Sequence, residues 1–349
     1  MLNKRFSKIS DIIQDAKKGK MFILVDDKNR ENEGDLIIPA SKCNAKSINF
    51  MAKHGRGLIC LALSKKQIDT LKLPLMSPKN KSRMQTAFTI SIEAKKGITT
   101  GISAQDRAKT IKIAINPRVK KNEIVSPGHV FPLVARTGGV LERAGHTEAS
   151  VDISKLSNLN PSSVICEVMN EDGRMARLND LFKFSKKHKI KLASIEDLIS
   201  YRLKYEKLIS KIETKNFFLK NIGKLSLYNY KNKLENNINF VITKGKLNTK
   251  KSIIVRVLSM KIKNNILKNN KIIKVLRTLN GYKNFLLLII NKKDHLENNN
   301  INTLRYYGIG AQIIKDLNVK NMILISRTKK KIIGLEGFGL KIKRQIIIK

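Results

Sequence analysis

The spacing of apolar residues predicts both helices and strands in the first part of the chain. A 3.6-residue helical period links four apolar positions, Ile9, Ile12, Ile13 and Ala16. Gly19 is placed to end this helix. Residues 21–25 (MFILV) are a short apolar run, which predicts a buried strand leading directly into an acidic segment.

Predicted strands and helices continue to alternate along the chain to about residue 205. Residues 57–63 and 87–94 read as strands, and a strand beginning at residue 162 closes in a turn at 170–173. Helices are predicted after two capping residues, Ser103 and Ser194, the latter in a capping box with Asp197. Intermingled strands and helices predict an α/β domain with a mixed sheet flanked by helices.

The composition changes near residues 204–214. After Lys207 the chain contains six acidic residues among many lysines and asparagines. Strands are still predicted at 238–245 and 252–259, and a helix at 308–317, so this half is also expected to fold as α/β. We therefore predict two domains, 1–206 and 207–349.

The formal charge of +43 is the most unusual bulk property of the chain. Such basicity is typical of proteins that bind nucleic acid, and a basic RNA-binding protein is one alternative function. An AT-rich coding sequence would also produce abundant Lys, Asn and Ile on solvated faces. The sequence contains no zinc-finger spacing, no RNP-like aromatic pattern and no Gly/Arg tail, so nucleic acid is disfavoured as a partner.

The cysteines and the hydropathy predict a soluble cytoplasmic protein. The three cysteines, Cys43, Cys60 and Cys166, are irregularly spaced and odd in number, which favours reduced thiols. The start of the chain lacks the apolar run of a signal peptide. The longest later apolar stretch, 285–290, is far shorter than the roughly 20 residues of a membrane-spanning helix, so no membrane partner is expected.

The segment 26–35 (DDKNRENEGD) is the first that indicates chemistry. It holds five carboxylates and one arginine, directly after a predicted strand. Close carboxylates raise one another's pKa unless a cation offsets them. A divalent metal would do so, and such a site suits a phosphorylated, hydroxyl-rich substrate; a solvated acidic turn explains the segment equally well.

The segment 128–149 is the second segment that indicates a functional site. It contains His129 and His146, two of the five histidines of the chain, each directly after a glycine. Residues 143–147 (RAGHT) supply a guanidinium, a hydroxyl and glycine-freed backbone N–H groups, which are the usual components of a phosphate site. A lone histidine is usually structural, but two beside such turns favour a site.

Two further segments carry charge in suggestive places. Glu167 lies on a predicted strand between apolar neighbours, where a carboxylate must be paired, bound to a metal or protonated. Residues 99–107 place Asp106 and Arg107 near a helix start. A capped helix with an ion pair explains that second segment as well as a site does.

In their order and wording these segments closely resemble the 3,4-dihydroxy-2-butanone 4-phosphate synthases over about residues 5–205. The matching motifs are DDKNRENEGD, HGRGLICLAL, TAFTISIEA, TTGISAQDRAKTI, GHVFPLVARTGGVLERAGHTEASVDI and CEVMNEDGRMAR. The resemblance implies a lyase of riboflavin biosynthesis that converts D-ribulose 5-phosphate into 3,4-dihydroxy-2-butanone 4-phosphate and formate. It also implies a homodimer with sites near the subunit interface.

The resemblance carries roles onto matching residues. Glu31 and His146 would bind magnesium, or manganese in its place. Substrate contacts would come from Arg30, Glu31, Asp35, Arg143, Ala144, Gly145, His146, Thr147 and Glu167, with Arg143 and Thr147 at the phosphate. His129 and Glu167 match positions essential for catalysis, and Glu33 and Cys60 match positions lining the site. Ribulose 5-phosphate has a carbonyl flanked by acidic C–H bonds, so acid–base groups and a hard cation suit it.

Residues 304–342 resemble the C-terminal part of GTP cyclohydrolase II. Active members of that family hold a zinc ion with three cysteines, but this chain has none after Cys166, and His295 alone cannot replace them. We therefore predict a degenerate cyclohydrolase-like domain without that activity. A bifunctional enzyme with GTP cyclohydrolase II activity is the remaining alternative.

Overall fold

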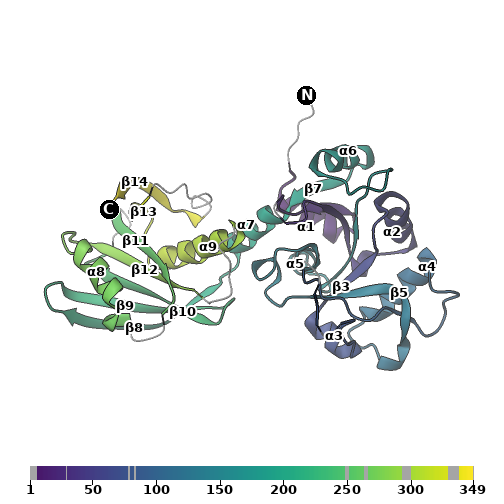
Figure 1. Ribbon diagram of the computed structural model, residues 1–349, viewed down its shortest axis with the longest axis horizontal. Coiled ribbons are helices and arrows are strands. Elements are labelled where there is room, and N and C mark those ends of the chain that lie inside the picture. Colours follow the sequence, from purple (N-terminus) through teal and green to yellow (C-terminus); the bar gives the residue numbers. More distant parts are fainter. Residues whose placement is uncertain are drawn as a thin grey trace. The chain divides into compact units, whose positions relative to one another are not determined.

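The computed structural model describes residues 6–28, 30–77, 79–81, 84–247, 251–262, 266–292, 300–328 and 338–348. The chain divides into two compact units, Met1–Ile199 and Ser200–Lys349 (Figure 1). The domain boundary proposed from the sequence, after residue 206, lies just beyond helix α7 (Ile195–Tyr205). His295 lies outside the described residues.

The first unit is built on one mixed sheet. Its strands are β1 (Phe22–Val25), β2 (Gly34–Pro39), β3 (Cys60–Ser64), β4 (Ile92–Ala94), β5 (Ile124–Ala135), β6 (Ser162–Glu167) and β7 (Lys191–Ser194). Their order in the sheet is β4-β5-β3-β6-β2-β1-β7. The pairs β1–β7 and β3–β5 are parallel and the other pairs are antiparallel.

Helices cover both faces of this sheet (Figure 1). They are α1 (Ile9–Lys17), α2 (Ala45–Phe50), α3 (Lys65–Leu71), α4 (Ala104–Ala114), α5 (His146–Leu156) and α6 (Leu178–His188). The main core joins one sheet face to α2, α4 and α6, and its buried residues include Leu36, Leu61, Cys166, Ile48, Ile111 and Leu181. On the other face Val151 of α5 packs against Ala62 and Ala135. Because side chains alternate along a strand, residues next to the core positions point toward α5.

The predicted local signals in this unit are largely confirmed. Ser103 accepts a hydrogen bond from the backbone N–H of Asp106 at 3.0 Å, and Ser194 accepts one from that of Asp197 at 3.0 Å. The strand predicted at 87–94 is too long, because the ladder covers only Ile92–Ala94. Its earlier part forms isolated bridges at Phe88 and Thr89.

The second unit contains another mixed sheet. Its strands are β8 (Ile209–Leu219), β9 (Gly223–Asn232), β10 (Asn237–Lys244), β11 (Ile253–Met260), β12 (Phe285–Asn291), β13 (Asn321–Ser326) and β14 (Lys341–Ile347), in the order β14-β13-β11-β12-β10-β9-β8. Leu287 packs in a core with Ile272 of helix α8 (Asn270–Leu279). The adjacent Leu288 lies beside Gly310 of helix α9 (Asn300–Asp316), so the two helices cover opposite faces. The predicted α/β class is confirmed for both units.

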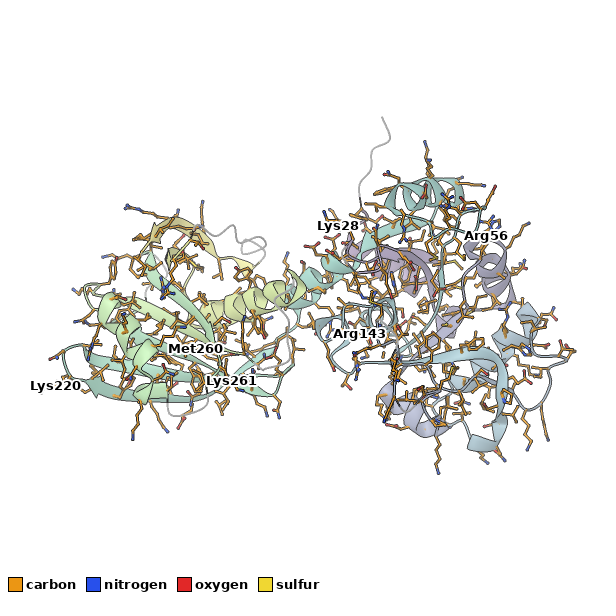
Figure 2. All side chains as sticks on the ribbon, viewed as in Figure 1. Lys28, Arg56, Arg143, Lys220, Met260 and Lys261 are labelled. Atoms are coloured by element: carbon orange, nitrogen blue, oxygen red, sulfur yellow. The ribbon has the colours of Figure 1, made fainter. Side chains whose placement is uncertain are left out.

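The basic side chains are distributed over many elements of the fold. Figure 2 shows nitrogen-tipped side chains extending around both units, for example Lys28 after β1 and Lys220 in the turn between β8 and β9. This distribution fits a compositional origin of the positive charge. Within the described ranges, no helix is both long and apolar enough to span a lipid bilayer.

The core of the first unit predicts a large effect of one truncation. Leu61 is 0% exposed, so Leu61→Ala should lower the free energy of unfolding of this unit by about 2–5 kcal/mol through lost burial and a residual cavity. Leu75 is 46% exposed, and Leu75→Ala should change it by less than about 0.5 kcal/mol. Chemical unfolding of both variants measures the difference, and equal costs would contradict this description of the core.

Candidate active site

The candidate site lies where the ends of three neighbouring strands meet the start of a helix. Asp35 on β2 is directly opposite both Leu24 of β1 and Glu167 of β6 in the strand register. Its position next to Leu36, a core residue of the other face, points it toward α5. His146 is the first residue of α5. Residues far apart in the sequence are therefore brought to one place by the sheet.

The acidic loop after β1 is organised by Asp26. Its carboxylate accepts hydrogen bonds from the backbone N–H of Glu31 at 3.1 Å and of Glu33 at 2.9 Å. It also pairs with the guanidinium of Arg30 at 2.8 Å, and Arg30 in turn pairs with Glu31. From α6's start, Arg177 donates to the carbonyl oxygen of Glu31 at 2.8 Å. The loop is thus held in one shape despite its charge.

His146 lies within this acidic cluster. Its Nδ1 is 3.8 Å from Oε2 of Glu31 and 3.7 Å from Oδ1 of Asp35. The side chain is buried, and neither its Nε2 nor Oδ1 of Asp35 has a hydrogen-bond partner among the described residues. Ligand atoms of Asp26, Glu31 and His146 lie within 4.8 Å of one another. Buried polar atoms without partners, beside carboxylates, fit a bound divalent cation.

The protonation equilibria reflect this crowding of negative charge. Burial, reinforced by the charges of Glu167 and Glu31, raises the pKa of Asp35 well above its ordinary value. Burial also raises the pKa of Glu167, and burial together with Glu31 raises that of Glu33. Burial lowers the pKa of His146, which favours the neutral imidazole that binds metals. A cation at this position would reverse the penalty on the carboxylates.

Glu167 lies opposite Asp35 in the strand register, and Cys60 lies close enough to both carboxylates for their charges to act on its thiol. Oε2 of Glu167 accepts a hydrogen bond from the backbone N–H of Leu58 at 2.8 Å. Gly57 lies so close to Glu167 that an added Cβ would be 2.5 Å from Oε2, so the chain needs glycine there. Burial, with the nearby charge of Glu167, raises the pKa of Cys60 well above its ordinary value. Its thiol is therefore protonated at neutral pH.

Residues 143–147 form the entry to α5. Gly145 caps the helix without a side-chain hydrogen bond, which leaves backbone N–H groups of the first turn available for an anion. Arg143 (Figure 2) donates to Glu148 at 2.6 Å and to Thr86 at 3.0 Å. The guanidinium is thereby fixed beside the first turn. Thr147 and Ala144 are both buried.

His129 is the one predicted catalytic residue that the structure places apart. It lies on β5, and strand β3 separates β5 from β6 and Glu167. Its Nδ1 is 3.0 Å from Oε2 of Glu93, and its side chain is 43% exposed. Among the described residues it makes no hydrogen bond or ion pair with the cluster around His146. Within a single chain, therefore, His129 forms a second polar centre.

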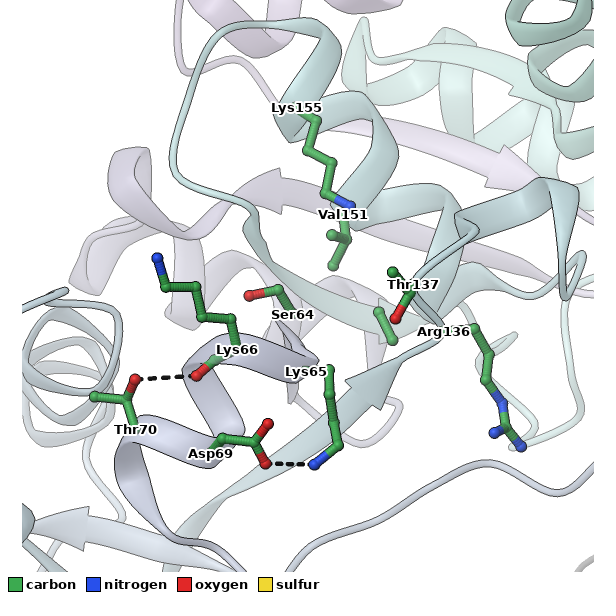
Figure 3. A pocket seen from close by; sticks show the side chains of 10 residues that line it. Ser64, Lys65, Lys66, Asp69, Thr70, Arg136, Thr137, Val151 and Lys155 are labelled. Carbon is green, nitrogen blue, oxygen red and sulfur yellow. Dashed lines mark hydrogen bonds and ion pairs between the residues drawn. The ribbon is translucent and has the colours of Figure 1, made fainter. Parts of the chain in front are cut away.

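A separate pocket lies between α3, the end of β5 and α5. It has a volume of about 650 Å³ and contains no residue of the acidic cluster (Figure 3). Lys65 and Asp69 pair within it, and Thr70 donates to the carbonyl oxygen of Lys66 at 3.0 Å. The lysine and arginine side chains that line it are exposed. The pocket therefore resembles the rest of the basic surface and not a buried binding site.

Comparison with known protein families gives two matches along the chain. The family model of 3,4-dihydroxy-2-butanone 4-phosphate synthase matches residues 10–201. The chain belongs to this family. A second model, GTP cyclohydrolase II, matches residues 273–347 in the second unit.

Similar proteins cover both units. Riboflavin biosynthesis protein RibBA of Aquifex aeolicus (strain VF5) is 42% identical over 378 residues, which cover 99% of this chain and 93% of the relative. The 3,4-dihydroxy-2-butanone 4-phosphate synthase of Photobacterium phosphoreum is 41% identical, with 96% of this chain and 98% of the relative covered. Whole-chain similarity therefore extends to relatives named as synthases.

Solved structures that are similar to this chain are also described as synthases. RibBX of A. baumannii, described as a two-domain 3,4-dihydroxy-2-butanone 4-phosphate synthase, has a TM-score of 0.83 and 38% identity, covering 98% of this chain and 100% of that one. A synthase structure in complex with two magnesium ions has a TM-score of 0.55 and 38% identity, covering 57% of this chain and 98% of that one. The fold is thus that of a two-domain synthase.

Asp26 is the functional residue to which sequence analysis assigned no role. Its position as the first residue after a strand, four residues before Arg30, was the available signal, because such a carboxylate can pair with Arg30 and accept loop N–H groups. The structure makes it both the organiser of the acidic loop and a member of the candidate metal group with Glu31 and His146.

The raised pKa of Asp35 predicts how stability depends on pH in this synthase without metal. A folded-state pKa above the ordinary Asp value means that stability falls as pH rises through the interval between the two. Asp35→Asn removes this loss and should raise the free energy of unfolding near neutral pH by about 1 kcal/mol. Urea unfolding with a chelator at about pH 5 and about pH 8 tests this, and an unchanged pH dependence in the variant would disprove it.

Proposed function

We propose that this chain converts D-ribulose 5-phosphate into 3,4-dihydroxy-2-butanone 4-phosphate and formate, and so supplies riboflavin biosynthesis. The observation that carries the proposal is the convergence of Glu31 and His146, from distant parts of the sequence, on one buried cluster with Asp35. The family membership of residues 10–201 supports the same reaction.

Glu31 and His146 would hold the magnesium ion, or manganese in its place. Asp26 lies within the same group of ligand atoms, and the unpaired Nε2 of His146 fits a site that is completed by a cation. The magnesium ions of the similar synthase structure support this choice of metal. When bound, the cation would act as a Lewis acid for negative charge developing on substrate oxygens.

The sugar phosphate would lie between the acidic loop and the start of α5. Residues Arg143, Ala144, Gly145 and Thr147 surround the first turn of α5, whose backbone N–H groups and positive helix end favour a phosphate. Arg30 and Asp35 would bind hydroxyl or carbonyl groups at the other end. The substrate would thereby be fixed at both ends, as an oriented proton transfer requires.

We propose that Glu167 transfers protons. Burial raises its pKa, so this carboxyl holds a proton more readily than an exposed glutamate, as a group that accepts and returns protons requires. The hydrogen bond from the backbone of Leu58 fixes its orientation. Glu167 and residues of the acidic loop would share the proton transfers that form the enediol, and His129 would act as a second acid–base group.

The metal proposal predicts the loss of activity in two variants. Glu31→Ala and His146→Ala should each lower formate release by more than about a hundredfold, because each removes a ligand, and should weaken magnesium binding measured by calorimetry. Glu171, whose side chain is 85% exposed, provides the control, and Glu171→Ala should keep parental turnover. Normal turnover by either ligand variant would refute the metal assignment.

The second unit is proposed to lack GTP cyclohydrolase II activity, although residues 273–347 match that family. All cysteines of the chain, Cys43, Cys60 and Cys166, belong to the first unit. A hydrolytic zinc ion held by thiolates therefore has no ligands in the second unit. We propose that this unit, residues 207–349 in our assignment, is a degenerate cyclohydrolase-like domain.

The absence of a zinc site predicts a negative result in a GTP assay. The purified full chain should produce formate from ribulose 5-phosphate with magnesium, but should leave GTP unchanged in the presence of added zinc. Metal analysis should find well under one zinc per chain. An active GTP cyclohydrolase II run in parallel validates the assay. Opening of the guanine ring, or stoichiometric bound zinc, would establish the bifunctional alternative.

A homodimer is also proposed, as the family resemblance implies. The exposed apolar side chains Leu58, Ile102 and Val125 support it, with exposed fractions of 43%, 53% and 37%. Ile102 follows Gly101, which lies against His129.

A further inference from the structure

The pair formed by His129 and Glu93 is the basis of a further inference, which rests on the proposed role of His129. Nδ1 of His129 and Oε2 of Glu93 are 3.0 Å apart. We propose that Glu93 is a positioning residue, which fixes the tautomer and orientation of the His129 imidazole so that its Nε2 is left available as a base. Neither the sequence motifs nor the metal cluster assigns Glu93 a role.

A bulge in β5 directs His129 toward Glu93. Ile92 of β4 is opposite Val130, whereas the next residue, Glu93, is opposite Val125, so residues 126–129 are extra on β5. Bulges of this kind redirect side chains, and they occur often near active sites. The extra residues bring His129 to the position at which it meets the side chain of Glu93.

The bulge is fixed to the neighbouring segment by short polar contacts. Ser126 donates to the carbonyl oxygen of Ser91 at 2.7 Å, and the backbone N–H of Gly128 donates to Oγ of Ser91 at 3.1 Å. An added Cβ at Gly128 would lie 2.2 Å from the carbonyl carbon of Ile92. Only glycine permits this approach, so the residue before His129 is held directly against β4.

A third segment supports the pair from the α4 side. An added Cβ at Gly101 would lie 2.1 Å from Oε2 of Glu93 and 2.8 Å from Nδ1 of His129. Gly101 has a φ of +85°, which glycine adopts without strain. Asp106 accepts hydrogen bonds from the N–H of Gly101 at 3.1 Å and from the hydroxyl of Thr99 at 2.8 Å. The 99–107 segment therefore packs against the pair formed by His129 and Glu93.

This arrangement determines which ring nitrogen of His129 is available. An ionised carboxylate only accepts hydrogen bonds, so the nitrogen facing Glu93 must carry the proton. The other nitrogen, Nε2, then has a free lone pair and can act as a base. The His129 side chain is 43% exposed and that of Glu93 only 22%, so the imidazole remains accessible while its partner is more covered.

Glu93→Gln tests the proposal because it keeps the size of the side chain but removes its charge. A glutamine can donate as well as accept, so it no longer enforces one tautomer. We expect kcat for formate release to fall about 10- to 100-fold, with KM changed by less than about twofold. ¹⁵N NMR of histidine-labelled full chain should show the Nδ1–H form of His129 in the parent and a mixture in the variant. The other four histidines are separated by comparison with His129→Gln.

A matched pair of glycines gives an independent test. Gly101→Ala should displace Glu93 and His129 and lower kcat as Glu93→Gln does. Gly97 also has a positive φ, of +72°, but a Cβ there would meet only the flexible end of Lys109. Gly97→Ala should therefore carry similar backbone strain while leaving kcat and the His129 tautomer unchanged. Circular dichroism establishes that both variants are folded.

The outcomes separate this inference from the proposed function. If Glu93→Gln keeps parental kcat and the parental tautomer while His129→Ala is inactive, Glu93 is no positioning residue and the synthase proposal stands. If His129→Ala itself turns over normally, the catalytic role of His129 is wrong and this inference is overturned with it. A loss of kcat together with a mixed tautomer in Glu93→Gln supports the proposal.

Discussion

The concentration of negative charge at the start of α5 is the constraint on which the candidate site depends. Asp26, Glu31 and Asp35 are brought within a few ångströms of His146, in a protein whose overall charge is strongly positive. Buried carboxylates repel one another, and burial together with the charges of Glu167 and Glu31 raises the pKa of Asp35. Arg30 offsets part of this charge, and the remaining carboxylates belong to the group of residues proposed to hold a divalent cation.

The sheet makes that concentration possible. Strand β2 lies between β1 and β6, so Asp35 is held opposite both Leu24 and Glu167 in the strand register. The helix that begins at His146 lies over this face. Each charged group therefore stands on a regular element or on a loop fixed by Asp26, and few side chains need to be ordered when substrate binds. The raised pKa of Asp35 corresponds to a cost of ionising this carboxyl in the folded, metal-free state.

Local signals in the sequence were sufficient for some elements and insufficient for others. The caps at Ser103 and Ser194 and the helical period of α1 predicted their helices correctly, because those signals depend on neighbouring residues. The long strand β5 and helix α5 were not predicted, since glycines and prolines interrupt the pattern of β5 and polar residues fill α5. The meeting of Glu31 with His146 depends on strand pairing, which periodicity cannot show; there the family resemblance supplied the residues. It could not supply the contact between His129 and Glu93, because that contact arises from a register shift.

The burial of the cysteines bears on how the protein withstands oxidation. Thiolates, not thiols, react with peroxides and electrophiles. Burial raises the pKa of Cys43 to about 12, and burial beside Glu167 raises those of Cys60 and Cys166 as well. Burial, with the nearby charge of Glu167, thus keeps the thiols of Cys60 and Cys166 protonated, the form that reacts slowly with oxidants.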